Sequence, residues 1–161
     1  PPMQAGMKKL VQQADIITPN FTEACFLLAE GYRSEFSDMA AIRQWLQRLA
    51  DFGPSMVVIT GIPCGDGKIM NAGYDRRKEL FLSDLSAHIP VKYPGTGDIY
   101  ASVLLGGLLQ EESLAVAMNR AAKVVYEAIK ATVEANTPSR EGVLLERVLP
   151  RLCAEFWRGR I

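Results

Sequence analysis

The sequence predicts an α/β protein whose mostly parallel sheet is covered by helices on both faces. Two short apolar runs, 14–17 and 56–60, are rich in isoleucine and valine, which is typical of buried parallel strands. Segments with helical spacing of apolar residues lie before the first run and between the two. Strands separated by helices pair in parallel, because the helix returns the chain to the same end of the sheet.

The first sixty residues hold three of the expected helices. In order, we expect a helix over 3–13, the strand 14–17, a helix over 21–30, a helix between a Ser37-Asp38 cap and Gly53-Pro54, and the strand 56–60. The apolar positions are Ala24, Phe26, Leu27 and Leu28 in the second helix and Ile42, Trp45, Leu46 and Leu49 in the third. Gly31 is expected to end the second helix. The strand 56–60 is expected in the interior of the sheet.

The remaining residues predict a small antiparallel patch followed by helices. We expect a turn-rich segment at 61–67, strands over 68–74 and 80–82 around the polar turn 75–79, an extended piece at 89–91, and helices over 98–110, 113–134 and 143–157. The second of these helices has an apolar stripe that predicts core packing: Leu114, Ala117, Met118, Ala121, Val124, Val125 and Ile129. With no linker or repeat, one α/β unit over 1–161 is expected.

Composition and charge exclude several classes of function. Lysine plus arginine and aspartate plus glutamate each number 18, so no overall field attracts nucleic acid or an anionic membrane. Cys25, Cys64 and Cys153 are far apart and form no Cys-x-x-Cys pair, which predicts unpaired thiols in a reducing cytoplasm. Apolar runs such as 101–109 are too short to span a bilayer. The start, Pro1-Pro2-Met3, has no signal-peptide layout, and together with an immediate helix it predicts a fragment or a processed chain.

The strongest candidate site is the sequence Gly95-Thr96-Gly97-Asp98 at the start of an expected helix. A helix N-terminus has unpaired backbone N–H groups and about half a positive charge, so it attracts anions such as phosphate. Glycines allow the backbone to approach a phosphate closely. Asp98 would then be placed to accept a proton from an attacking hydroxyl. The same residues are common at ordinary helix starts, and that reading stays open.

A second candidate follows the strand 14–17, in the segment from Thr18 to Glu23. Ligands of open α/β sheets bind beyond the carboxyl ends of strands. Asn20 and Glu23 are three residues apart at a helix start, so both can present oxygen atoms to Mg²⁺, directly or through water. The alternative is a capping box, in which each side chain bonds the other residue's backbone.

Three further features follow the central strand. Thr60-Gly61 at its end could meet a phosphate or a ribose. The segment 61–68 looks superficially like a P-loop, but Ile62 occupies the place of the first glycine and Ile69 that of the Ser/Thr, so Asp66-Gly67 predicts a hairpin turn instead. His88 has no second His or Cys at ligand spacing, which favours a surface histidine or one with its hydrogen bonds satisfied.

Together these pieces resemble the ribokinase-like superfamily, and within it the pyridoxal and pyridoxamine kinases. The resemblance rests on 15–23, 57–61 and 93–98 in this order and spacing, and on 128–130 and 140–145 near the end. Thr96 is similar to the pyridoxal kinase form, whereas the sugar kinases usually have Gly-Ala-Gly-Asp. The hydroxymethylpyrimidine kinases typically have a glycine pair after the central strand, where this chain has Gly61-Ile62-Pro63. The fold implied is a three-layer α/β/α arrangement with a mostly parallel sheet.

The resemblance implies a role for each residue near the last glycine-rich segment. Asp98 matches the base that takes the proton from the vitamin's 5′-hydroxyl. The amides of Gly95, Thr96 and Gly97 match the anion hole for the γ-phosphate. The loop from Ile89 to Tyr93 matches the loop beside the adenosine.

The resemblance also implies roles at the two strand ends. Asn20 and Glu23 match the motif that organises Mg²⁺ and the phosphates, and Thr18 lies near a monovalent cation such as K⁺ in some members. Thr60 and Gly61 match the nucleotide-phosphate side.

The implied activity is ATP-dependent phosphorylation of the 5′-hydroxyl of pyridoxal, pyridoxine or pyridoxamine, by a cytoplasmic homodimer. Family members carry an N-terminal region of roughly 110–120 residues that supplies the first strands and most contacts to the vitamin. That region is absent here, so we expect the 161 residues alone to be inactive. The alternatives are a kinase for hydroxymethylpyrimidine or another small alcohol, and a non-catalytic nucleotide-binding or assembly module.

Overall fold

The computed structural model describes residues 2–36, 38–150 and 152–153. By their internal contacts the residues form two compact units, which we call unit 1 (Pro1–His88) and unit 2 (Ile89–Ile161). Each unit is considered by itself. The expectation of one undivided α/β unit stays a prediction.

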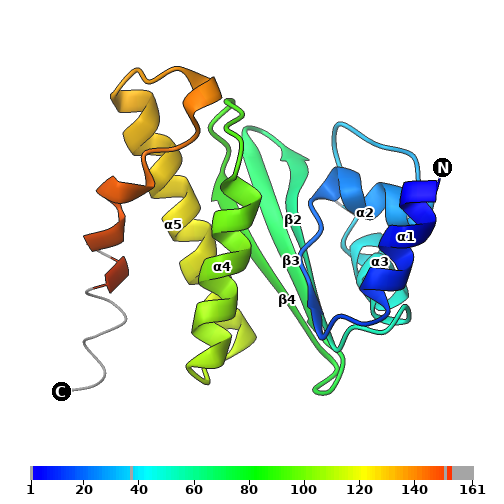
Figure 1. Cartoon of the computed structure of the whole chain (residues 1–161). Coiled ribbons are helices and arrows are strands. Elements are labelled where there is room, and N and C mark those ends of the chain that lie inside the picture. Colours follow the sequence, from blue (N-terminus) through cyan, green and yellow to red (C-terminus); the bar gives the residue numbers. More distant parts are fainter. Residues whose placement is uncertain (1, 37, 151, 154–161) are drawn as a thin grey trace. The chain divides into compact units, whose positions relative to one another are not determined.

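Unit 1 consists of three helices and a four-stranded sheet. Its elements are α1 (Pro2–Val11), β1 (Ile16–Ile17), α2 (Phe21–Leu28), α3 (Met39–Ala50), β2 (Met56–Gly65), β3 (Lys68–Asp75) and β4 (Leu80–Ala87). The strand order is β1-β2-β3-β4, so β2 lies in the interior of the sheet, as predicted. Figure 1 shows the three helices on one side of this sheet.

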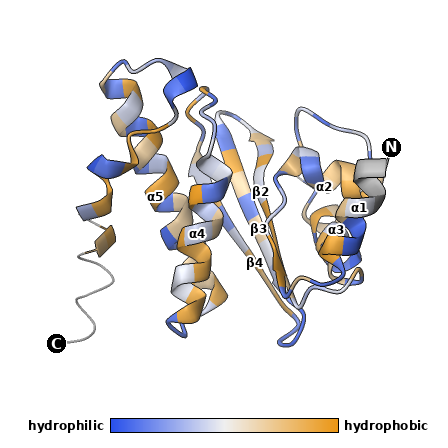
Figure 2. Cartoon of the chain, viewed as in Figure 1, coloured by the Kyte–Doolittle hydropathy of each residue, from blue (hydrophilic) through white to orange (hydrophobic). Residues whose placement is uncertain are grey.

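The pairing within the sheet is mixed. β1 and β2 are parallel, with Ile16 opposite Met56, and β2, β3 and β4 form an antiparallel meander. Asp66 and Gly67 connect β2 to β3 with φ angles of 48° and 63°, the left-handed pair that a two-residue hairpin turn requires. The predicted antiparallel patch and hairpin turn are therefore confirmed. The turn after β3 is hydrophilic, as Figure 2 shows.

An aromatic cluster forms the centre of the unit 1 core. Phe21 of α2 stacks on Trp45 of α3 with ring centroids 5.6 Å apart, and Phe36 contacts both rings. The predicted stripe of α3 is buried throughout: Ile42, Trp45, Leu46 and Leu49. Asp38 caps α3 through the amides of Ala40 and Ala41, because its carboxylate satisfies N–H groups that the helix leaves unpaired.

Several predicted bounds in unit 1 differ from the structure. α2 ends at Leu28, and Ala29 rather than Gly31 takes the left-handed conformation, with φ 57°. Phe26 is 64% exposed, although its helix is otherwise packed on the core. Both β2 and β4 are longer than expected, since pairing with β3 extends them beyond the residues whose own pattern indicates a strand.

Unit 2 is helical. It contains α4 (Thr96–Leu109), α5 (Leu114–Glu134) and two short 3-10 helices, Ser139–Glu141 and Leu145–Arg147. The helix expected over 143–157 is wrong in its first half, where the structure has only the second 3-10 turn and a short helical stretch; residues 151 and 154–157 lie outside the described residues. The extended piece expected at 89–91 is a tight turn in which the Val91 amide donates to the Ile89 carbonyl.

α4 and α5 lie side by side and antiparallel (Figure 1). Most of the predicted α5 stripe is buried, while Val125 and Ile129 are half-buried. Gly107 of α4 is buried, and a Cβ there would lie 3.1 Å from the Cβ of Ala117. The small residues therefore set how closely the two helices approach. Among the described residues, no helix combines the length and apolar character that a membrane span needs.

Candidate active site

The helix predicted after the glycine-rich segment is present as α4, and it begins two residues earlier than expected, at Thr96. Gly95 is the N-cap residue and takes the left-handed conformation (φ 84°, ψ −5°), which glycine adopts without strain. No side chain caps this helix end. The Thr96 hydroxyl donates to the Tyr93 carbonyl at 3.3 Å, which fixes the loop before the helix. The first backbone N–H groups of α4 therefore point out of the N-terminal end of the helix, and no side chain of the described residues accepts them as a cap.

Open space surrounds Gly97, the second residue after the cap. A Cβ at Gly97 would meet no atom of the described residues within 4 Å, and Gly97 does not need a positive φ. Packing within the chain therefore gives no reason for glycine at this position, whereas a ligand in close contact with the backbone would. Asp98 is exposed in the first turn, beside this space. The arrangement suits an anion held by backbone N–H groups next to a carboxylate.

Unit 2 also contains a support for this loop. Thr132 of α5 is fully buried; its hydroxyl donates to the Ala128 carbonyl and accepts the Leu144 amide at 2.8 Å. The segment after α5 is thereby fixed. In this segment Gly142 has a φ of 77°, and a Cβ added to it would lie 3.6 Å from the Pro94 carbonyl oxygen. The C-terminal segment 140–145 therefore lies against the loop that begins the candidate site.

The start of α2 is a complete capping box. Asn20 Oδ1 accepts the Glu23 amide at 2.9 Å, and Glu23 Oε2 accepts the Asn20 amide at 2.9 Å. Of the two readings that the sequence left open, the capping arrangement is present in the structure. Both residues are exposed, and the box uses only one carboxylate oxygen of Glu23. A cation role for the remaining oxygens is compatible with this geometry and stays a prediction.

Thr60 is brought next to this capping box. The Thr60 amide donates to the Pro19 carbonyl at 2.9 Å, and Asn20 and Thr60 form an isolated parallel bridge. Asn20, Glu23 and Thr60 therefore lie close together, just beyond the carboxyl end of β1. The prediction that Thr60 and Gly61 end the central strand is wrong, because pairing with β3 continues β2 to Gly65. Gly95–Asp98 belong to unit 2 and are placed by α4 alone.

Gly61 is held by a residue that the sequence pattern did not single out. Its φ is 66°, and its amide donates to Asn71 Oδ1 of β3 at 3.1 Å. Asn71 is only 5% exposed. A buried asparagine in a strand is unusual, since asparagine is depleted in strands, and this could have drawn attention to it.

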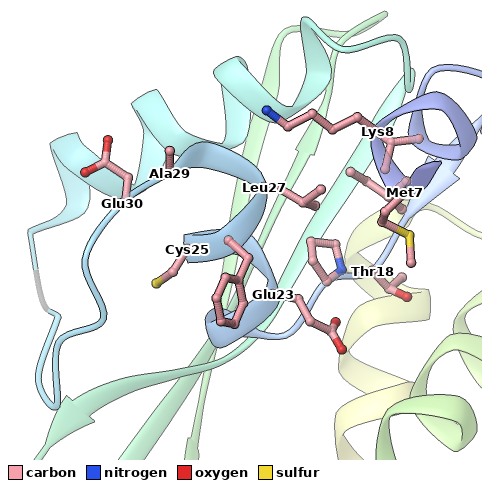
Figure 3. A pocket seen from close by; sticks show the side chains of 12 residues that line it. Met7, Lys8, Thr18, Glu23, Cys25, Leu27, Ala29 and Glu30 are labelled. Carbon is pink, nitrogen blue, oxygen red and sulfur yellow. The ribbon is translucent and has the colours of Figure 1, made fainter. Parts of the chain in front are cut away.

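A groove of about 830 Å³ lies in unit 1 between α1, the end of β1 and α2. Most of its lining is apolar, and Thr18 and Glu23 contribute polar groups (Figure 3). Cys25 and Glu30 also border it. Two of the three residues predicted to organise a cation therefore face one concave surface.

The oxygen atoms that could bind a metal ion are not clustered among the described residues. The described residues contain no group of three or more His, Cys, Asp or Glu side chains that could hold an ion. Mg²⁺ usually keeps several waters and takes one or two carboxylates together with substrate phosphates. Glu23 fits this mode, whereas a dedicated site made of protein ligands alone is not formed by the described residues.

The remaining predicted residues are placed as follows. Tyr93 is buried and Ile89 half-buried in the loop that leads to Gly95, and His88 is exposed, as predicted for a surface histidine. All three cysteines are free thiols. Burial raises the pKa of Cys25, to which the Glu30 carboxylate also contributes, and burial raises the pKa of Cys64. Neither thiol is poised as a nucleophile, since the reactive form is the thiolate.

Comparison with known proteins gives one consistent family. The family model described as phosphomethylpyrimidine kinase matches residues 2–142. Human pyridoxal kinase is 30% identical over 149 residues, covering 84% of this chain and 46% of the human protein. The hydroxymethylpyrimidine/phosphomethylpyrimidine kinase of Aquifex aeolicus is 28% identical over 123 residues, covering 76% and 46%. The chain therefore spans about half the length of the curated relatives it matches.

Solved structures agree with this result. A Bacteroides thetaiotaomicron protein assigned as a phosphomethylpyrimidine kinase superposes with a TM-score of 0.88 at 38% identity, covering 94% of this chain and 52% of that one. Pyridoxal kinase from Lactobacillus plantarum superposes with a TM-score of 0.81 at 30% identity, covering 96% and 55%. The fold expected from the sequence is thus confirmed, and the chain belongs to the phosphomethylpyrimidine kinase family of ribokinase-like proteins.

Proposed function

We propose that the protein containing this chain transfers the γ-phosphoryl group of ATP to the 5′-hydroxyl of pyridoxal, pyridoxine or pyridoxamine. The observation that carries the proposal is the uncapped start of α4, where open space at Gly97 adjoins the exposed carboxylate of Asp98. The family supports a phosphotransferase with an alcohol acceptor. The B6 vitamers are supported by the resemblance to pyridoxal kinases and by the Bacteroides relative, whose structure was also solved in a form with pyridoxal.

In this proposal ATP and Mg²⁺ supply the phosphoryl group and neutralise part of its charge. The residues of the chain position and polarise the reactants, because phosphoryl transfer requires little covalent work from the protein. Asp98 accepts the proton of the attacking hydroxyl. The amides of Gly95, Thr96 and Gly97 stabilise the negative charge on the transferring group.

The other roles are proposed for the strand ends of unit 1 and the loop before α4. Asn20 and Glu23 organise Mg²⁺ and the phosphates, with Thr18 near a monovalent cation such as K⁺. Thr60 and Gly61 bind the nucleotide phosphates. The loop from Ile89 to Tyr93 lies along the adenosine. We further propose a cytoplasmic location and a homodimeric assembly for the complete protein.

The test is Asp98→Asn in the complete protein, with ADP formation followed in the presence of pyridoxal. Asparagine keeps the size of the side chain but cannot accept the proton, so we expect kcat to fall by about 10²–10⁴-fold. The Kd for Mg-ATP should stay within about threefold. Normal turnover by the variant would refute the role of Asp98. The 161 residues alone are expected to show no turnover, and measurable phosphorylation by them would contradict that expectation.

A second candidate, phosphorylation of hydroxymethylpyrimidine, is favoured by the description of the family model and by the Aquifex relative. The same assay distinguishes the two, because ADP formation depends on the acceptor supplied. A kcat/KM for hydroxymethylpyrimidine well above that for all three B6 vitamers would replace the proposed substrate while leaving the assignment of Asp98 intact.

A further inference from the structure

We propose that Asn71 is a positioning residue for the nucleotide site, acting through the backbone of Thr60 and Gly61. The inference rests on the proposed nucleotide role of those two residues. It begins with the register of β2 and β3, in which Ile59 lies opposite Ala72 and Ile62 opposite Met70. Two residues of β2 therefore face a single residue of β3, which is Asn71. This is a β-bulge in β2, and Asn71 is the single residue of β3 that lies opposite it.

The bulge removes Thr60 and Gly61 from the regular ladder of hydrogen bonds. On one side, the Thr60 amide donates to the Pro19 carbonyl at 2.9 Å. On the other side, the Gly61 amide donates to the side chain of Asn71 at 3.1 Å. The bulge is thus held from both neighbouring strands, by backbone on the β1 side and by a side chain on the β3 side.

A side chain is needed here because the bulge leaves the Gly61 amide without a ladder partner. A partly buried N–H group without an acceptor costs free energy, and a strand normally supplies a carbonyl. The strand neighbours of Asn71, Met70 and Ala72, point to the opposite face of the sheet and belong to the core of unit 1. Asn71 is itself only 5% exposed, and a buried polar side chain needs a hydrogen-bond partner, which the Gly61 amide provides.

The consequence of this bond is the direction of the bulge. Gly61 is exposed, and a Cβ there would meet nothing within 4 Å among the described residues, so the bulge projects into open space. With the Gly61 amide engaged by Asn71, the half-exposed Thr60 hydroxyl remains as the donor for a phosphate oxygen. Asn71 itself is too buried to touch a nucleotide. It acts by fixing the backbone that does.

Three variants of the complete protein test the proposal. Asn71→Leu has a similar volume and no acceptor, Asn71→Asp keeps an acceptor in the same place, and Val57→Ala is a control that creates a cavity in β2 away from the bulge. Val57 is fully buried opposite Tyr74, so its truncation destabilises the same strand pair without touching Gly61. The measurements are the Kd for Mg-ADP by calorimetry, the KM for ATP and kcat, and the hydrogen exchange rate of the Gly61 amide.

We expect Asn71→Leu to raise the Kd for ADP and the KM for ATP by about three- to tenfold, the loss of roughly one hydrogen bond's net contribution. The kcat should stay unchanged, because the interaction is made equally in the ground state and the transition state. Gly61 should exchange faster in this variant. Asn71→Asp should restore both the exchange protection and the KM, and Val57→Ala should leave both unaltered.

The outcomes separate this inference from the proposed function. Wild-type affinity for ADP in Asn71→Leu, in a protein that binds ADP and phosphorylates its substrate, overturns the role of Asn71 alone. A KM that rises equally in Val57→Ala also overturns it, since the effect would then reflect general destabilisation. Absence of nucleotide binding by the wild-type protein overturns the proposed function and this inference together.

Discussion

Replacing Gly107 with alanine tests the close approach of the two helices of unit 2. The new Cβ would lie 2.7 Å from Glu112 Oε2 and 3.1 Å from Ala117 Cβ. Ala117 is fully buried in α5 and cannot retreat. Glu112 is held by an ion pair to Arg120 in which the two side chains are only 20% and 15% exposed. Relieving the contact therefore disturbs either the helix pair or the ion pair.

The expected change in the free energy of unfolding for Gly107→Ala is the balance of two opposing effects. Overpacking of a filled interface costs about 1–3 kcal/mol, and weakening a largely buried ion pair adds to this. Alanine in a helix interior is more favourable than glycine by about 0.8–1.0 kcal/mol. The steric term is larger, so we expect a net loss of about 1–2 kcal/mol. For a chain of this size that lowers the Tm by about 2–8 °C.

The assay is thermal unfolding followed by circular dichroism, with Gly97→Ala as the matched control. Gly97 is in the same helix, but an alanine there would meet nothing within 4 Å. The control should be as stable as the wild type or slightly more stable, since it gains helix propensity without a clash. A Gly107→Ala protein that melts at or above the wild-type temperature would refute the reasoning from packing.

Two further predictions concern single side chains. Thr132→Val should cost about 1–3 kcal/mol of unfolding free energy, because the partly buried Leu144 amide loses its acceptor. It should also expose 138–148 to limited proteolysis, and an unchanged cleavage rate would contradict the role of Thr132. Cys25 should react with iodoacetamide more slowly than the exposed Cys153 at pH 8, because burial raises its pKa and lowers its thiolate fraction there. Raising the pH above the ordinary thiol pKa should bring the reaction rates of the two cysteines closer together. Equal rates at pH 8 would contradict the raised pKa of Cys25.

The parts of the fold that local sequence determines could be predicted. Ile42, Trp45 and Leu49 repeat at helical spacing, and α3 buries all three. Asp66-Gly67 favours a tight turn in almost any context, and the hairpin is formed there. The candidate site at Gly95–Asp98 could be proposed from the sequence because an anion site at a helix start needs only consecutive residues.

The parts that depend on partners distant in the chain could not be predicted. α2 ends at Leu28 with Ala29 as its C-cap, because the amides of Ala29 and Glu30 donate back to carbonyls of the last turn, and Gly31 did not indicate this end. The bulge opposite Asn71 depends on the register between two strands, and no pattern within one strand specifies it. Residues 143–148 contain a 3-10 turn instead of the expected regular helix, and Thr132 holds the backbone there through the Leu144 amide.

The capping box of α2 limits how Glu23 can coordinate a cation. One carboxylate oxygen, Oε2, already accepts the Asn20 amide, so the other is the less engaged of the two. Bidentate coordination, which Ca²⁺ commonly takes, would compete with the bond from the Asn20 amide, while the Asn20 side chain would still cap the helix. Mg²⁺ accepts a single carboxylate oxygen in an octahedral shell completed by water. At the proposed cation site, the capping box therefore favours an ion that takes a single carboxylate oxygen over one that takes both.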